Sequence, residues 1–152
     1  MFMNKRAFIF LLLLIFVVAL FTYRTQTASK ATQFGDVSLK LEYATKETTR
    51  QIGLGRRTSL SEDEAMLFVF PKSDRYGFWM KDMLIPIDIF WLDDKGQVVT
   101  IAEQVATSSY PNVFYPSAPA RYVLETVSGF AQRHAITTNS KLLLKDFPSV
   151  SQ

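Results

Sequence analysis

Residues 77–96 read GFWMKDMLIPIDIFWLDDKG, and this stretch decides the fold more than any other part of the chain. In residues 85–92 apolar side chains alternate as in a β-strand, and Asp88 interrupts the apolar run. The following Asp-Asp-Lys-Gly turn, residues 93–96, predicts a hairpin whose second strand covers residues 97–102. The stretch therefore predicts a β-hairpin within a mainly β domain.

The flanking segments extend this prediction. Four more strands are expected, at residues 37–43, 66–70, 76–80 and 121–127, and a final strand is expected at residues 141–145. Two short helices are expected at residues 45–52 and 128–134. Pro71 is expected to end the strand at residues 66–70, and residues 107–120 are expected to form a long loop with three prolines. We expect a compact β-sandwich or barrel-like single domain with two short helices.

Composition excludes several classes of protein. The chain has 152 residues, which suits one domain, and it has no cysteine, which excludes a disulfide framework and a thiolate metal site. Residues 1–30 carry four basic residues and no acid, whereas residues 31–152 carry thirteen basic and fourteen acidic residues. The domain itself is therefore nearly neutral, and we expect no nucleic-acid partner.

The N-terminal segment predicts export. Lys5 and Arg6 precede an uncharged run, residues 7–23, that Arg24 ends. Such a run is about 25 Å long as a helix, so residues 1–24 are expected to form a signal-anchor helix or a cleaved signal peptide. Residues 25–34 then form a flexible tether, residues 35–146 the β domain and residues 147–152 a tail. We expect a single-pass protein of the cytoplasmic membrane with its domain outside, or a secreted protein if the segment is cleaved.

Three segments carry a resemblance to a known family. They are GLGRRTSLSEDEAMLFVF (53–70), FWMKDMLIPIDIFWLDDKGQVV (78–99) and YPSAPARYVLETVSGFAQRHAI (115–136). Together they resemble the "domain of unknown function 192" family over about residues 36–145. The resemblance implies a small, mainly β domain, often behind an N-terminal signal or anchor in bacteria, and implies no assigned activity. Asp82 stands where the family usually has an asparagine, which changes the chemistry beside Lys81.

Six residues are candidates for ligand binding: Arg57, Trp79, Lys81, Asp88, Arg121 and Glu125. Asp88 stands in an apolar strand, where a carboxylate needs a ligand, a cationic partner such as Arg57, Lys81 or Arg121, or backbone donors. Trp79 with Lys81 and Asp82 could form a platform on which a sugar or a cation stacks, or the tryptophan could belong to the core with a solvated turn after it.

Two roles are open for the domain. The favoured one is a binding or accessory module for a small molecule, a glycan or a partner protein, with no cofactor. The alternative is a glycosidase-like hydrolase of the cell envelope in which Asp88 and Glu125 flank the scissile bond. His134 is the only histidine, so no histidine-rich metal site is expected, and a helix-capping or surface role suits it best.

Overall fold

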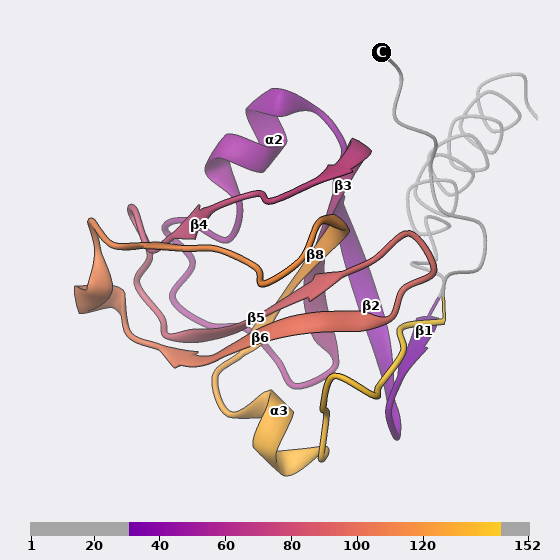
Figure 1. Ribbon diagram of the computed structural model, residues 1–152. Coiled ribbons are helices and arrows are strands. Elements are labelled where there is room, and N and C mark those ends of the chain that lie inside the picture. The colour runs from indigo at the N-terminus through magenta and orange to yellow at the C-terminus, as the bar shows by residue number, and fades with distance from the viewer. Residues whose placement is uncertain (1–30, 144–152) are drawn as a thin grey trace, which may run out of the picture.

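The computed structural model describes residues 31–143 (Figure 1). Six strands form one sheet in the order β1-β2-β3-β8-β5-β6, in which only the β2–β3 pair is parallel. The strands are β1 (Ala31–Phe34), β2 (Val37–Ala44), β3 (Glu64–Asp74), β5 (Ile87–Leu92), β6 (Val98–Val105) and β8 (Ala120–Val127). Strands β4 (Phe78–Trp79) and β7 (Val113–Phe114) pair separately, and the helices are α2 (Glu47–Ile52), the single-turn 3₁₀ helix η1 (Thr107–Ser109) and α3 (Phe130–Arg133).

The six-stranded sheet is curled into a half-barrel. Phe34 of β1 bridges to Leu142, and Gln97, just before β6, bridges to Lys141, so residues 141–142 link the two edge strands. A mainly β fold with two short α-helices is thus confirmed. Of the two forms expected, the sheet takes the barrel-like one, as a half-barrel, and it is not a sandwich because the β4–β7 pair is too short to form a second packed sheet.

Both faces of the sheet are buried. One core lies against α3 and includes Phe34, Phe90, Leu124 and Phe130. The other core lies on the opposite face, towards β4 and α2, and includes Phe68, Phe78, Trp91 and Val123. Figure 1 shows α3 on one side of the sheet and α2 with β4 on the other. Two-sided burial explains why the strand segments read as continuous apolar runs.

The hairpin of residues 87–105 is confirmed, with β5 and β6 paired around the turn at Asp93. The alternation predicted for residues 85–92 is also confirmed, since Ile87, Ile89 and Trp91 all lie in the second core. The strand expected at residues 76–80 is reduced to β4, and β4 pairs with β7 rather than with β5. Residues 107–120, expected as a loop, contain η1 and β7.

Three boundaries differ from the sequence predictions. Residues 31–34, assigned to the tether, form β1, because Thr32 and Phe34 are buried and the Gly35 turn (φ +62°) folds them onto β2. The strand at residues 66–70 continues past Pro71 to Asp74. Strand β3 can include Pro71 because its pairing with β8 is interrupted between Val69 and Asp74. Proline has no backbone N–H, and none is needed for the sheet at this point.

The final strand predicted at residues 141–145 is reduced to the two bridges at Lys141 and Leu142. The predicted N-terminal helix and the C-terminal tail lie outside the described residues. Within residues 31–143, no helix is long and apolar enough to cross a membrane.

Candidate functional site

A cavity of about 640 Å³ opens between residues 47–56 and residues 76–83, above the second core. Aromatic and aliphatic side chains form much of its lining: Leu54, Phe68, Phe70, Tyr76, Phe78, Trp79 and Met83. Charged side chains complete it: Glu47, Arg50, Arg56, Lys81, Asp82 and Glu125. A large apolar pocket with a few convergent polar groups is the usual form of a small-ligand site.

The two walls of the cavity are joined by their backbones. The Arg56 N–H donates a hydrogen bond to the Asp82 carbonyl at 2.8 Å. Both residues have left-handed backbones, with φ of 63° and 58°, although neither is glycine. Such conformations cost free energy and persist where the surrounding structure requires them, often at binding sites. The mouth of the cavity is therefore held in a defined shape.

Glu125 lines the cavity from the middle of β8, between Met66 of β3 and Ile89 of β5. It is 4% exposed. The Leu54 N–H donates to its carboxyl group, but Oε2 has no hydrogen-bond partner among the described residues. Burial raises the pKa of Glu125 from 4.5 to about 8, against the opposing effects of the Leu54 N–H and the Arg57 charge. At neutral pH this carboxyl is mostly protonated and can donate a hydrogen bond.

Gly53 explains how the backbone comes so close to this carboxyl. It follows α2 with φ +54°, and its N–H donates to the Thr49 carbonyl. A Cβ added at Gly53 would lie 3.2 Å from the Phe68 ring and 3.7 Å from Glu125 Oε2. The glycine therefore both ends the helix and lets the chain pass directly over the acid.

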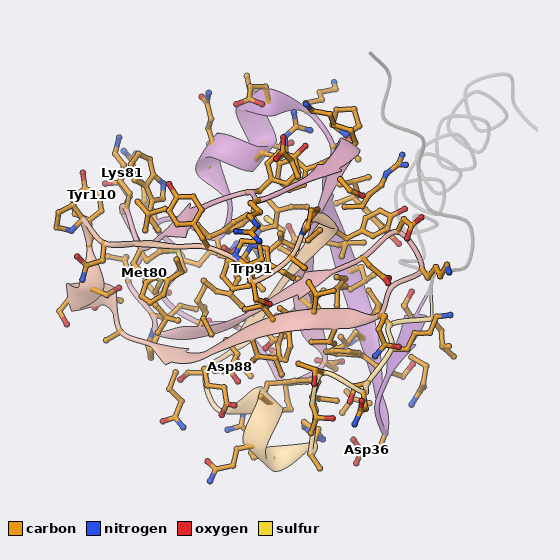
Figure 2. All side chains as sticks on the ribbon, in the orientation of Figure 1. Asp36, Met80, Lys81, Asp88, Trp91 and Tyr110 are labelled. Carbon is orange, nitrogen blue, oxygen red and sulfur yellow. The ribbon has the colours of Figure 1, made fainter. Side chains whose placement is uncertain are left out.

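Trp79 and Lys81 lie at the rim of the cavity. Trp79 of β4 is half exposed, and its ring centroid lies 6.0 Å from that of Tyr110. Lys81 Nζ lies 5.9 Å from the Trp79 ring centroid. Figure 2 shows Lys81 and Tyr110 together at one end of the molecule. The structure thus brings Trp79, Lys81 and Glu125 to one cavity, along with Asp82.

Asp88 does not belong to this site. Its side chain is fully buried and accepts hydrogen bonds from three backbone N–H groups, those of Gln104 (2.7 Å), Gly129 (2.9 Å) and Ala131 (2.8 Å). The last two lie at the start of α3, whose N-cap residue is Gly129, so the Asp88 side chain caps that helix. Figure 2 places Asp88 beside α3.

Asp88 and Glu125 lie on opposite faces of the sheet. Asp88 is paired with Thr126, whereas Glu125 is paired with Ile89. Paired residues share a face and successive residues alternate, so the two carboxyl groups point away from each other. They cannot flank one glycosidic bond, and the hydrolase hypothesis built on them is wrong for this reason.

The two predicted arginines also serve the fold. Arg57 makes a bidentate ion pair with Glu42, at 2.5 and 2.6 Å, beside a separate smaller hollow of about 410 Å³. Arg121 Nε donates to the Phe70 carbonyl at 3.2 Å. Neither arginine is among the residues that line the larger cavity.

His134 lies away from the cavity, after α3. Its ring nitrogens contact Asp36 Oδ1 at 2.9 Å and Glu62 Oε1 at 2.8 Å, and Arg133 also pairs with Glu62 at 2.9 Å. This cluster links α3 to the β1–β2 turn and to the segment before β3. In the part of the chain that the structure describes, no three His, Asp or Glu side chains are grouped to hold a metal ion.

Sequence reasoning missed the other lining residues. Arg50 and Arg56 come from α2 and its following turn, and Met83 follows the Lys81-Asp82 pair. The turn signal at Gly53-Leu54-Gly55 was visible in the sequence, but nothing in the sequence indicated that this turn packs over Glu125, seventy residues away.

The fold and the cavity define the class: a small half-barrel domain with a partly apolar ligand-sized pocket. Residues 28–144 match the DUF192 family, described as "Uncharacterized ACR", and the chain belongs to that family. No curated protein matches the sequence.

Two solved bacterial structures are similar to this chain. One is a Sinorhizobium meliloti 1021 protein described provisionally as a transcription regulator, with 28% identity and a TM-score of 0.66. The match covers 68% of this chain and 80% of that one. The other is a Novosphingobium aromaticivorans DSM 12444 protein of unknown function, with 28% identity, a TM-score of 0.66, and coverage of 71% and 76%.

Proposed function

We propose that this chain is a membrane-tethered, extracytoplasmic binding module whose ligand occupies the cavity between residues 47–56 and 76–83. The observation that supports this proposal most strongly is that Glu125 is buried, lines the cavity and has one oxygen without a hydrogen-bond partner among the described residues. A buried acid with an unpaired oxygen is costly to the fold, and a buried acid with a raised pKa that lines a cavity is a candidate for ligand contact. Glu125 lines a cavity of ligand size whose rim carries the half-exposed Trp79.

The arrangement of the domain suits a tether at the other end. Figure 1 shows β1, where the chain enters the domain, and β4, which carries Trp79, at opposite ends of the sheet. The Leu143 N–H donates to the Gln33 carbonyl, so both ends of the described chain meet near β1. A domain attached through its N-terminus would therefore present the cavity away from its point of attachment.

The tether is tested by location. We expect the full-length protein to remain in the membrane fraction after an alkaline carbonate wash. We also expect protease added to spheroplasts to degrade the domain, and deletion of residues 1–24 to leave it in the cytoplasm. A domain that resists protease until the spheroplasts are lysed would contradict the proposed orientation.

The binding site is tested with a ligand panel. Cell-envelope glycans, muropeptides and small metabolites are screened by thermal shift against the wild type and the Trp79→Ala, Lys81→Ala and Lys95→Ala variants. We expect one chemical class to raise the Tm of the wild type and of Lys95→Ala, which changes an exposed hairpin residue remote from the cavity lining. The rim variants should lose most of that shift. A panel without any stabilising ligand, or a shift that survives both rim substitutions, rejects the proposed site.

A further inference from the structure

We infer that the ligand is an N-acetylated sugar unit whose ring stacks on Trp79 and whose acetamido group enters the cavity and accepts a hydrogen bond from Glu125. The inference deepens the proposed binding role and rests on it. Three features of the cavity lead to it: the aromatic rim, the apolar walls and the neutral acid.

The rim carries exposed aromatic rings in a cluster. Trp79, Tyr110 and Tyr115 are 50%, 47% and 62% exposed. Tyr115 lies against Gly77, a lining residue, since a Cβ added at Gly77 would be 2.6 Å from the Tyr115 ring. Large aromatic side chains are usually withdrawn from water, and an exposed cluster marks a binding surface. A pyranose presents a C–H face of matching size to such a ring, while its hydroxyls remain in reach of polar groups.

The walls suit a small apolar group and not a bare hydroxylated sugar. Phe68, Phe70 and Phe78 form one connected aromatic cluster, with ring centroids 4.8 Å apart for Phe68 and Phe78 and 6.5 Å apart for Phe70 and Phe78. Hydroxyl groups placed against these rings would lose their hydrogen bonds to water. A methyl group placed there would instead gain by leaving water.

Glu125 places a polar group beside these rings, and the Arg50 guanidinium lies 5.3 Å from the centroid of the Phe70 ring. In its protonated form the carboxyl needs an acceptor, and an amide carbonyl oxygen provides one. The Arg57 charge lowers the pKa of Glu125, but burial raises it by more, so Glu125 stays protonated. Arg57 is itself paired with Glu42. An acetamido group carries a methyl group and a carbonyl group within a few ångströms of each other. The methyl group can pack against Phe68 while the carbonyl oxygen accepts a hydrogen bond from Glu125.

The charged groups at the mouth carry a net charge of +1 when Glu125 is protonated, and they include both donors and acceptors for the hydroxyls of a sugar. Glu47 and Arg50 form an ion pair at 2.9 Å, which leaves Arg56, Lys81 and Asp82 as the remaining charged lining groups besides Glu125. Lys81 and Asp82 provide a donor and an acceptor side by side, which suits the hydroxyls of a neutral sugar.

The test compares two tetrasaccharides that differ at the 2-position of each unit. Chitotetraose carries acetamido groups and cellotetraose carries hydroxyls. Calorimetric titration of the full-length protein in nanodiscs should give at least tenfold tighter binding of chitotetraose. Trp79→Ala should weaken that binding at least tenfold, and Leu84→Ala, which removes an exposed apolar side chain outside the cavity lining, should leave it unchanged.

The role of Glu125 is tested by pH. Binding of chitotetraose to the wild type should weaken as the pH rises above about 8, because the ionised carboxyl no longer donates. Glu125→Gln keeps an N–H donor and should bind with little pH dependence. Tighter binding of chitotetraose to the wild type at high pH would show that the ionised carboxylate is the better partner for the sugar, and it would overturn the inference.

The other outcomes are distinguishable. Equal binding of both tetrasaccharides, abolished by Trp79→Ala, rejects the acetamido group but keeps the cavity as a binding site. If an N-acetylated peptide binds at the rim and chitotetraose does not, the sugar is rejected while the proposed function stands. Failure of every probe in the panel removes both proposals.

Discussion

Asp88 and Glu125 are one position apart in the β5–β8 register, yet the two faces of the sheet give their carboxyl groups opposite environments. Asp88 accepts hydrogen bonds from three backbone N–H groups, those of Gln104, Gly129 and Ala131. Glu125 accepts the Leu54 N–H and keeps one oxygen unpaired beside the cavity. Asp88 therefore stabilises the fold, and Glu125 is the carboxyl that we propose as the contact for a ligand.

Replacing Asp88 with asparagine should destabilise the domain by about 2–4 kcal/mol, because an amide replaces one acceptor oxygen with a donor that faces backbone N–H groups. Urea unfolding measures the loss. Asp94→Asn, in the exposed hairpin turn, is the control and should change the free energy of unfolding by less than about 0.5 kcal/mol. Normal stability of Asp88→Asn with loss of ligand binding would return Asp88 to the candidate site.

Glu125 should make the stability of the domain fall as pH rises. Its pKa is about 8 in the folded protein and near 4.5 when unfolded. Between these values the folded chain holds a proton that the unfolded chain has released, so stability is full below 4.5 and is lost up to about 8. The slope is at most about 1.4 kcal/mol per pH unit.

Unfolding of the wild type and of Glu125→Gln, measured from pH 5 to 9, checks this slope. The variant should lose this component of the slope and should exceed the wild type in stability at pH 9. Glu103→Gln, on the exposed surface of β6, should follow the wild type. Parallel profiles for all three proteins would show that Glu125 ionises normally.

At the scale of elements, the wall of the cavity depends on β5. Trp91 is fully buried in β5, and its Nε1–H donates to the Tyr76 carbonyl at 2.8 Å. This bond fixes the start of residues 76–83, and Trp91 also packs edge-on against Phe78 at 5.9 Å between centroids. The two tryptophans therefore have different tasks: Trp91 supports the wall, and Trp79 lies at its surface.

Trp91→Phe should cost about 2–4 kcal/mol of stability, because it leaves the Tyr76 carbonyl unpaired and removes buried volume. It should also speed amide hydrogen exchange in residues 76–83. Trp79→Phe, at a half-exposed position, should cost less than about 1 kcal/mol and leave exchange unchanged. Equal losses for the two variants would contradict the division of roles.

The elements show which features the sequence could predict. The β5–β6 hairpin was predictable because alternation and a turn are local signals, and both lie within residues 85–102. The pairing of β4 with β7 was not, because it joins Phe78 and Phe114 across a long connection. For the same reason the sequence identified Asp88 as a buried carboxylate but not its partner, the start of α3, whose N–H groups lie more than forty residues away.

Half of the candidate site was predictable by residue type. Trp79, Lys81 and Glu125 do meet at the cavity, since aromatic and charged residues in apolar segments are good candidates for a site. Arg57 and Arg121 do not line the cavity, although they were candidates by the same reasoning. Arg57 pairs with Glu42, and Arg121 donates to the Phe70 carbonyl. Local sequence carries no information on which acceptor a long side chain reaches.

At the scale of the whole molecule, residues 141–142 close the curl of the sheet. Leu142 is fully buried in the core with Phe34 and Phe130, and its backbone bridges to β1. The end of the domain therefore holds its first strand in place, so that β1 is not a free edge.

Leu142→Ala should destabilise the domain by about 2–4 kcal/mol through the lost contacts and the cavity left behind. Leu143→Ala, at the next and 45% exposed position, should change stability by less than about 0.5 kcal/mol. Urea unfolding of the pair tests the closure. Similar small losses for both would mean that the bridge to β1 contributes little.

If a neutral acid in the cavity wall meets the ligand, the titration of Glu125 must respond to ligand binding. The ¹³C chemical shift of the Glu125 carboxyl is followed with pH, with and without saturating chitotetraose. We predict a pKa of about 8 for the free protein and a higher value with the sugar, because a ligand that accepts from the protonated carboxyl must raise its proton affinity. A pKa near 4.5, or one that bound sugar leaves unchanged, would contradict the account.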